Sequence, residues 1–211
     1  MREHKKKNFQ FIYSHIVNNS KEYWSVIIIF IIGIVLGVIA LNNAGDLQKE
    51  EIQNFINIFI SNISDSNEID HTELLKNNFT NNIILIVLLT LFGSTVIGIP
   101  IVYGIVGFKG FCLSYTISSI IAVIGSTKGF IFVISSIFLQ NLIYIPCILA
   151  LAVSGIRLYK SITKDKNREN IKIEILRHLL FSFIIGLIFL FGTLIETYIS
   201  TNILKWVVQY L

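Results

Sequence analysis

Long apolar stretches with almost no charged side chains limit how this chain can fold more than any other feature of the sequence. A helix needs about 20 apolar residues to cross the roughly 30 Å hydrocarbon core of a bilayer. The composition agrees with several crossings, since 54% of the 211 residues are hydrophobic and only 14% are charged. A typical soluble domain carries about 25% charged residues. The sequence therefore predicts an all-α, polytopic integral membrane protein.

We expect a single membrane domain over residues 1–211, with five transmembrane helices at about 24–41, 83–108, 111–126, 130–156 and 179–200. The first stretch follows a basic segment, as the apolar region of a signal peptide would. It is eighteen residues long, and its exit at residues 40–43 reads Ala-Leu-Asn-Asn, which is a poor cleavage sequence. We therefore expect this stretch to be retained as a transmembrane helix.

The distribution of Lys and Arg predicts the orientation in the membrane, because these residues collect on the cytoplasmic side. The amino end, residues 1–23, carries a net charge of +3, and the loop 157–178 carries seven basic residues and a net charge of +4. The loop 42–82 carries seven acids and a net charge of −5. We predict that the amino end and loop 157–178 are cytoplasmic, and that loop 42–82 and the carboxyl end lie outside. This assignment requires the short apolar segment 111–124 to cross completely, with the help of flanking residues up to Ser126.

The outer loop 42–82 has the pattern of an amphipathic helix. Asp46 is a plausible N-cap, and a second helix is expected to start at Asp70 and lead into the second span. Apolar side chains recur at three- and four-residue spacing, which places them on one helical face. The face could pack on the protein's own spans, lie on the outer leaflet or dock a partner. Ile60 belongs to this pattern, and the candidate partner-docking residues are Ile52, Phe55, Ile56, Phe59 and Ile63.

The motifs of common enzymes are absent from the sequence. The four histidines are scattered over segments predicted on both sides of the membrane, so we expect no metal site, no cofactor and no catalysis. The basic loop 157–178 lacks a nucleic-acid-binding motif, and attraction to anionic lipid head groups explains its charge better. We expect contact with membrane lipids and none with nucleic acid. The sequence predicts no particular oligomeric state.

Polar groups inside the predicted spans are candidates for function, because such groups usually face the protein interior or a cavity. Gln140 and Asn141 precede Pro146 in the fourth span, where Pro146 leaves a backbone carbonyl free. These amides could join helices or line a substrate or ion site. Glu196 is the one acid inside a predicted span, roughly 6 Å from its outer boundary. It could make a structural hydrogen bond, contact a partner or handle protons.

Small residues at four-residue spacing favour close helix packing, and the clearest pair is Gly33 and Gly37 in the first span. Several of these segments together resemble the stage II sporulation protein M family. The resemblance rests on the first span with Gly-Ile-Val-Leu-Gly at 33–37, Gly-Asp-Leu-Gln-Lys-Glu-Glu-Ile at 45–52 and Gly-Phe-Lys-Gly-Phe at 107–111. It continues with Gly-Ser-Thr-Lys-Gly-Phe at 125–130, Gln-Asn-Leu-Ile-Tyr-Ile-Pro at 140–146 and Gly-Thr-Leu-Ile-Glu at 192–196.

The resemblance implies a non-enzymatic scaffold in the mother-cell membrane of an endospore-forming bacterium. Members of this family are thought to anchor and localise peptidoglycan-degrading partners, the stage II sporulation proteins D and P, at the septum during septal thinning and forespore engulfment. The alternative is the membrane subunit of a small-molecule or ion transporter, because polar residues near Pro146 could line a path. The spans show no obvious inverted repeat, which argues against transport.

Overall fold

The computed structural model describes residues 19–65, 71–95, 98–164 and 168–209, and these residues contain helices and no strands. Five helical segments are long and apolar enough to cross a membrane, namely 20–42, 71–93, 98–124, 126–163 and 171–208. The prediction of an all-α protein with five candidate spans is therefore confirmed. The basic residues of the amino end before residue 19, and Asp70 as a helix cap, lie outside the described residues.

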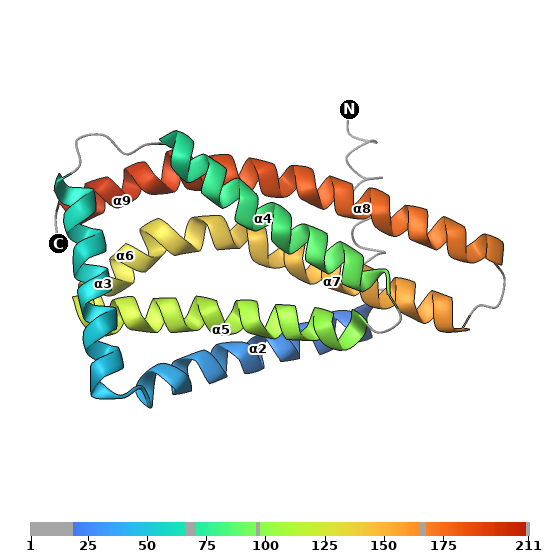
Figure 1. Cartoon of the computed structure of the whole chain (residues 1–211), viewed down its shortest axis with the longest axis horizontal. Helices are drawn as coiled ribbons and strands as arrows, with labels where there is room; N and C mark the ends of the chain where they lie inside the picture. The colour runs from blue at the N-terminus through green and yellow to red at the C-terminus, as the bar shows by residue number, and fades with distance from the viewer. Residues whose placement is uncertain (1–18, 66–70, 96–97, 165–167, 210–211) are drawn as a thin grey trace.

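The five segments run side by side along the long axis of the molecule (Figure 1). They are formed by α2 (Ser20–Asn42), α4 (His71–Gly93), α5 (Gly98–Ile124) and two composite helices. The first composite helix joins α6 (Ser126–Val133), the π-helical segment η1 (Ile134–Phe138) and α7 (Leu139–Lys164). The second joins α8 (Arg168–Leu194), the π-helical segment η2 (Ile195–Ser200) and α9 (Thr201–Val208).

One further helix, α3 (Asp46–Asp65), lies across one end of this bundle, which we call the α3 end (Figure 1). The end of α4, the end of α7 and the start of α8 lie at the opposite end. The expected N-cap of α3 is wrong by one position. Asp46 is the first helical residue, and the carbonyl of Gly45 accepts the first helical hydrogen bond, from Lys49.

The predicted break between the second and third spans is wrong. It was placed at residues 109–110, between spans 83–108 and 111–126, whereas the helices end and begin at Gly93 and Gly98. Pro100 falls in the first turn of α5, where a missing backbone donor costs nothing, so it begins a helix instead of interrupting one. The third span consequently has 27 residues, or about 40 Å of helix, and needs no borrowed residues.

The last two spans are also longer than predicted. The segment 157–178, expected as a loop, continues α7 to Lys164 and starts α8 at Arg168. His178, which was placed in that loop, is buried and lies 2.9 Å from the Ser154 hydroxyl. The fifth span does not end near Ser200, because η2 and α9 extend the helix to Val208.

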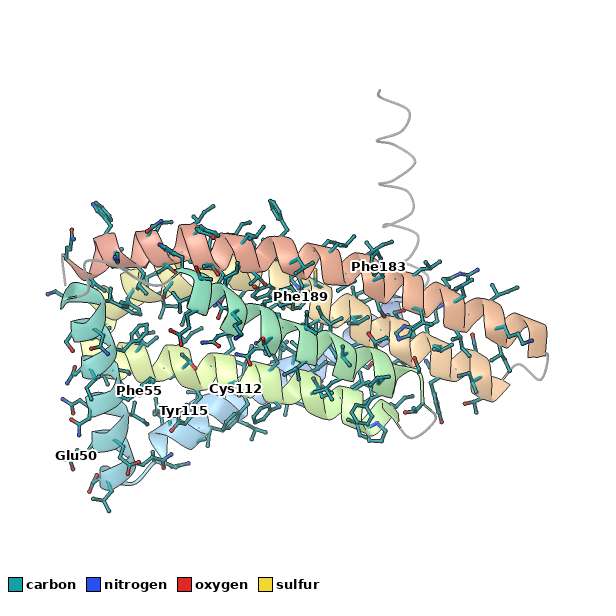
Figure 2. The ribbon with its side chains drawn as sticks, turned by 45° about the horizontal axis from the view of Figure 1, so that its top comes forward. Glu50, Phe55, Cys112, Tyr115, Phe183 and Phe189 are labelled. Carbon is teal, nitrogen blue, oxygen red and sulfur yellow. The ribbon has the colours of Figure 1, made fainter. Side chains whose placement is uncertain are left out.

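Close helix crossings hold the bundle together, and its outward faces are apolar. Gly33 and Gly37 lie where α2 crosses α5, and a Cβ at Gly33 would collide with the Gly107 carbonyl. Phe189 of α8 is 1% exposed inside the bundle, while Phe183 of the same helix is 67% exposed and points outward (Figure 2). Exposed apolar side chains of this kind suit contact with lipid tails.

The helix α3 is attached to the bundle by apolar packing and one polar contact. Ile56 is buried, and Ile52, Ile60 and Ile63 pack on the same apolar cluster as Ile120 and Leu204. The Gln48 amide donates a 3.0 Å hydrogen bond to the Tyr115 hydroxyl of α5. One side of α3 therefore packs on the protein's own helices.

Candidate intramembrane binding site

Four polar side chains from three helices form a hydrogen-bonded cluster inside the bundle. The Asn82 amide donates to the Tyr144 hydroxyl at 2.9 Å and to Thr193 Oγ1 at 3.0 Å. The Tyr144 hydroxyl donates to Glu196 Oε2 at 2.8 Å. Thr193 is 1% exposed and donates onward to the Phe189 carbonyl at 2.9 Å. The cluster ties α4, α7, α8 and η2 together.

The cluster lies deep along the helices. Asn82 comes eleven residues before the end of α4 at Gly93, and Lys109 comes eleven residues after the start of α5 at Gly98. At 1.5 Å per residue, both lie about 16 Å from the turn that joins these helices. Lys109 and Asn82 therefore stand at similar depth, about halfway across a hydrocarbon core of roughly 30 Å.

Glu196 lies much deeper than its predicted distance of about 6 Å from the outer boundary. The helix continues for twelve residues beyond it, to Val208, which is about 18 Å of helix. Its carboxylate turns inward to Tyr144 and is near enough to Lys109 for an electrostatic interaction. Glu196 and Lys109 thus face the same interior region.

Two π-helical segments flank this region. Glu196 is part of η2, Gln140 is the second residue after η1, and the two segments contact each other. A π-helical turn inserts an extra residue into an α-helix, and such insertions often occur at functional sites. The paired segments break the regular packing between the two composite helices at the level of the polar cluster.

Beside the cluster is a polar cavity of about 270 Å³, bounded by Lys109 and Cys112 of α5, Tyr144, Glu196 and five carboxamide side chains. These carboxamides belong to Asn78, Asn81, Asn82, Gln140 and Asn141. A larger groove of about 600 Å³ runs under α3 and is bounded mainly by apolar side chains, among them Phe55, Ile56 and Phe59. Asn78, Thr116, Ile137, Gln140 and Glu196 border both hollows, so the two are adjacent.

The bundle is closely packed between this cavity and the end opposite α3. Leu89, Val102, Ile148 and Leu151 are each at most 1% exposed in one apolar cluster. Gly93 and Gly155 also bring α4 and α7 into backbone contact there, since a Cβ on Gly155 would stand 2.7 Å from the Gly93 Cα. The polar cavity is consequently open toward the α3 end and blocked at the other end.

The structure brings some of the predicted polar residues together and separates one from them. Gln140, Asn141 and Glu196 line the polar cavity, while Pro146 is exposed and borders a different, apolar hollow. The Asn141 amide donates to the Ile137 carbonyl at 2.8 Å, one turn back in its own helix. It does not reach the carbonyl that Pro146 leaves free.

Lys109, Tyr144 and Asn82 were missed as site residues by the sequence analysis. Lys109 was missed because the break between spans was placed at it, which moved it from the bundle interior to a turn. Two signals could have corrected this, namely the Gly-Ser-Thr turn signal at 93–95 and the position of Pro100 just after it. Asn82 was assigned to the outer loop for the same reason.

The site residues do not form a metal centre, because the described residues contain no group of three or more His, Cys, Asp or Glu side chains that could hold an ion. Cys112 and Cys147 are free thiols. A cation, an acid, a phenol and several carboxamides around an open cavity are suited to bind a polar group by charge and hydrogen bonds.

The helices and their interior polar cavity define a multi-pass membrane protein of the helical-bundle class. The profile of the family described as stage II sporulation protein M matches residues 26–201. The chain belongs to the stage II sporulation protein M family, as its sequence motifs indicated. Comparison with curated proteins and with solved structures gave no significant match.

Proposed function

We propose that this sporulation-family membrane protein is a non-enzymatic scaffold. It would anchor and localise the peptidoglycan-degrading stage II sporulation proteins D and P at the septum, in the mother-cell membrane, during septal thinning and engulfment. Family membership supports a role in sporulation. The scaffold role, the partners and the location go beyond what family membership supports and are part of the proposal.

The observation that carries the scaffold role is the exposed apolar surface of α3. Leu47, Phe55 and Ile58 are 80%, 72% and 59% exposed, although α3 already packs on the bundle through Ile56. Burying one such side chain contributes about 1.5–3 kcal/mol, which makes this surface suitable for binding another protein. With the proposed orientation, α3 faces the wall, where peptidoglycan-degrading partners act.

The test replaces two exposed apolar side chains of α3 that border the groove under the helix but are not part of its buried cluster. Phe55→Asp with Phe59→Asp should preserve accumulation in the membrane and abolish recovery of the partner hydrolases by co-purification. The matched control is Asn54→Asp with Asn57→Asp, which adds the same charges at exposed positions of the same helix and should leave recovery unchanged.

Two results would contradict this docking surface. In the first, the Phe55 and Phe59 double variant accumulates normally and still recovers its partners. In the second, the double variant fails to accumulate although the asparagine control accumulates normally, which would mean that the two side chains serve the fold alone. Imaging of a fluorescent fusion in sporulating cells tests the septal location separately.

The alternative function, a transporter subunit, needs a path through the whole bundle. The polar cavity offers the beginning of such a path, but Leu89, Ile148 and Leu151 block its continuation. The structure therefore favours a scaffold with an interior binding site over a transporter.

A further inference from the structure

Lys109 is a cation in the interior of the bundle that has no direct partner among the residues that the structure describes. Its side chain is half-buried, and among the described residues no carboxylate lies within 4 Å of its ammonium group and no side chain or carbonyl forms a hydrogen bond with it. Glu196 interacts with it only at longer range, and the Tyr144 hydroxyl is bonded to that carboxylate. Charged groups at this depth normally have a counter-charge, so Lys109 is suited to hold an anionic group that enters the cavity.

The carboxamides around Lys109 are available for the same purpose. Gln140, Asn78 and Asn81 line the polar cavity and form no hydrogen bond with any other described residue. Each carboxamide supplies two N–H donors and a carbonyl acceptor. Together with the ammonium group of Lys109, their N–H groups can bind the oxygens of a phosphate. The carboxylate of Glu196 can accept a hydrogen bond from an amine or a hydroxyl on the same ligand.

The adjoining groove determines what the rest of the ligand must be. It is more than twice as large as the polar cavity, at about 600 Å³ against 270 Å³, and is mainly apolar. Ser119 and Ser200 line it, are 5% and 4% exposed, and have hydroxyls without a hydrogen-bond partner among the described residues. Buried hydroxyls without partners are uncommon, and ester or glycerol oxygens of a ligand would satisfy them.

We propose that the polar cavity and the groove together bind one membrane phospholipid, with its phosphate at Lys109, the amine or hydroxyl of its head group at Glu196 and an acyl chain in the groove under α3. A free inorganic phosphate would fill the polar cavity and leave the groove empty. An uncharged lipid would fill the groove and leave Lys109 without a counter-ion. A phospholipid is the ligand class that satisfies both hollows. This inference does not depend on the scaffold role.

The native thiol of Cys112 allows a direct test, because it lines the polar cavity one helical turn from Tyr115 (Figure 2). The protein is purified in detergent as the Cys147→Ala variant, so that alkylation by N-ethylmaleimide reports on Cys112 alone. The rate is measured with phosphatidylethanolamine, with a diacylglycerol of the same acyl chains, and with inorganic phosphate. At a lipid concentration ten times Kd, phosphatidylethanolamine should slow alkylation on the order of tenfold, and the other two additives should change it little.

Substitutions at Lys109 distinguish lipid bound in the polar cavity from non-specific shielding of Cys112 by detergent or lipid. Lys109→Gln should raise the Kd for phosphatidylethanolamine on the order of tenfold, since it removes a charge-assisted hydrogen bond. At the same lipid concentration, alkylation of this variant should then be slowed only about twofold. Lys109→Arg should retain most of the protection, because it keeps the cation. The matched control Lys205→Gln, which lies outside both hollows, should behave as the parent protein. Equal alkylation rates without lipid show that each variant keeps the cavity intact.

Three results would overturn the proposal. Protection that is equal in the parent protein and in Lys109→Gln would show that the lysine does not hold the phosphate. Equal protection by diacylglycerol would show that only the apolar chain binds and that the phosphate does not contribute. Equal protection by inorganic phosphate would show that the cavity binds a free anion and not a lipid. If Lys109→Gln does not fold, Glu196→Gln takes its place, and it should weaken protection by phosphatidylethanolamine while leaving protection by a phosphatidic acid of the same chains unchanged.

Discussion

The close crossing of α2 and α5 predicts the effect of a single methyl group. A Cβ on Gly33 would stand 2.9 Å from the carbonyl carbon of Gly107 and closer still to its oxygen. Non-bonded carbon atoms prefer about 3.5–4.0 Å, so Gly33→Ala must move the two helices apart by roughly 1 Å. Overpacking of this kind costs about 1–3 kcal/mol. For a chain of this length we expect the melting temperature to lie roughly 2–12 °C below that of a Gly→Ala variant without this collision.

Gly104 provides the matched control for this substitution. It lies on α5, and a Cβ there would have no atom within 4 Å. Both substitutions gain the same intrinsic helix propensity of about 1 kcal/mol, so the difference between them isolates the collision. The assay is thermal unfolding of the detergent-solubilised protein, followed by tryptophan fluorescence. The reasoning is refuted if Gly33→Ala melts at the same temperature as Gly104→Ala, because the helices would then accommodate the methyl group without cost.

Three further predictions concern the orientation and the polar cluster. A reporter enzyme that is active only outside the membrane should be active when fused after Leu211 and inactive after Lys164, and activity after Lys164 would overturn the orientation deduced from the charges. Replacing Gln140 and Asn141 together by Leu should leave membrane insertion intact, since apolar residues insert readily, and should impair sporulation. A normal spore yield would instead make both amides replaceable packing residues. Tyr144→Phe removes the hydroxyl that bonds Asn82 and Glu196, so the amide loses one of its two hydrogen bonds and the carboxylate loses its bond from Tyr144. The melting temperature should fall by roughly 2–12 °C for a loss of about 1–3 kcal/mol, whereas an unchanged melting temperature would show that water replaces the hydroxyl.

The sequence by itself determined the class of the protein and its number of spans. Apolar length and the scarcity of charge leave few alternatives to membrane helices, because a bilayer cannot hydrogen-bond an exposed backbone. The family was also evident from local motifs, such as the segment 140–146. The break between the third and fourth spans, predicted at residues 127–129, lies close by at Gly125, whose φ of 95° is a conformation that glycine adopts readily.

The ends of the helices were predicted less well, because hydropathy shows where apolar residues are and not where a helix turns. The second span was predicted to end before Lys109 and the third span to begin after it, because of the charge of this residue. In the structure the helix continues through it, because tertiary neighbours provide an interior cavity that accepts the charged side chain. At Gly93, where α4 ends, the backbone lies close to Gly155 of α7, a contact between helices that lie far apart in the sequence.

The candidate site was decided by the tertiary structure alone. Gln140 and Glu196 were identified as polar residues in apolar surroundings, but the sequence could not show that they meet. Tyr144 follows Gln140 by one turn on α7, whereas Asn82 and Lys109 come from α4 and α5, and only the packing of the helices places all of them around one cavity. Periodicity along a chain fixes which face of a helix is apolar, whereas the depth and rotation of each helix follow from its contacts with the others. The site exists because those contacts bring a cation and an acid to the same depth of the bundle.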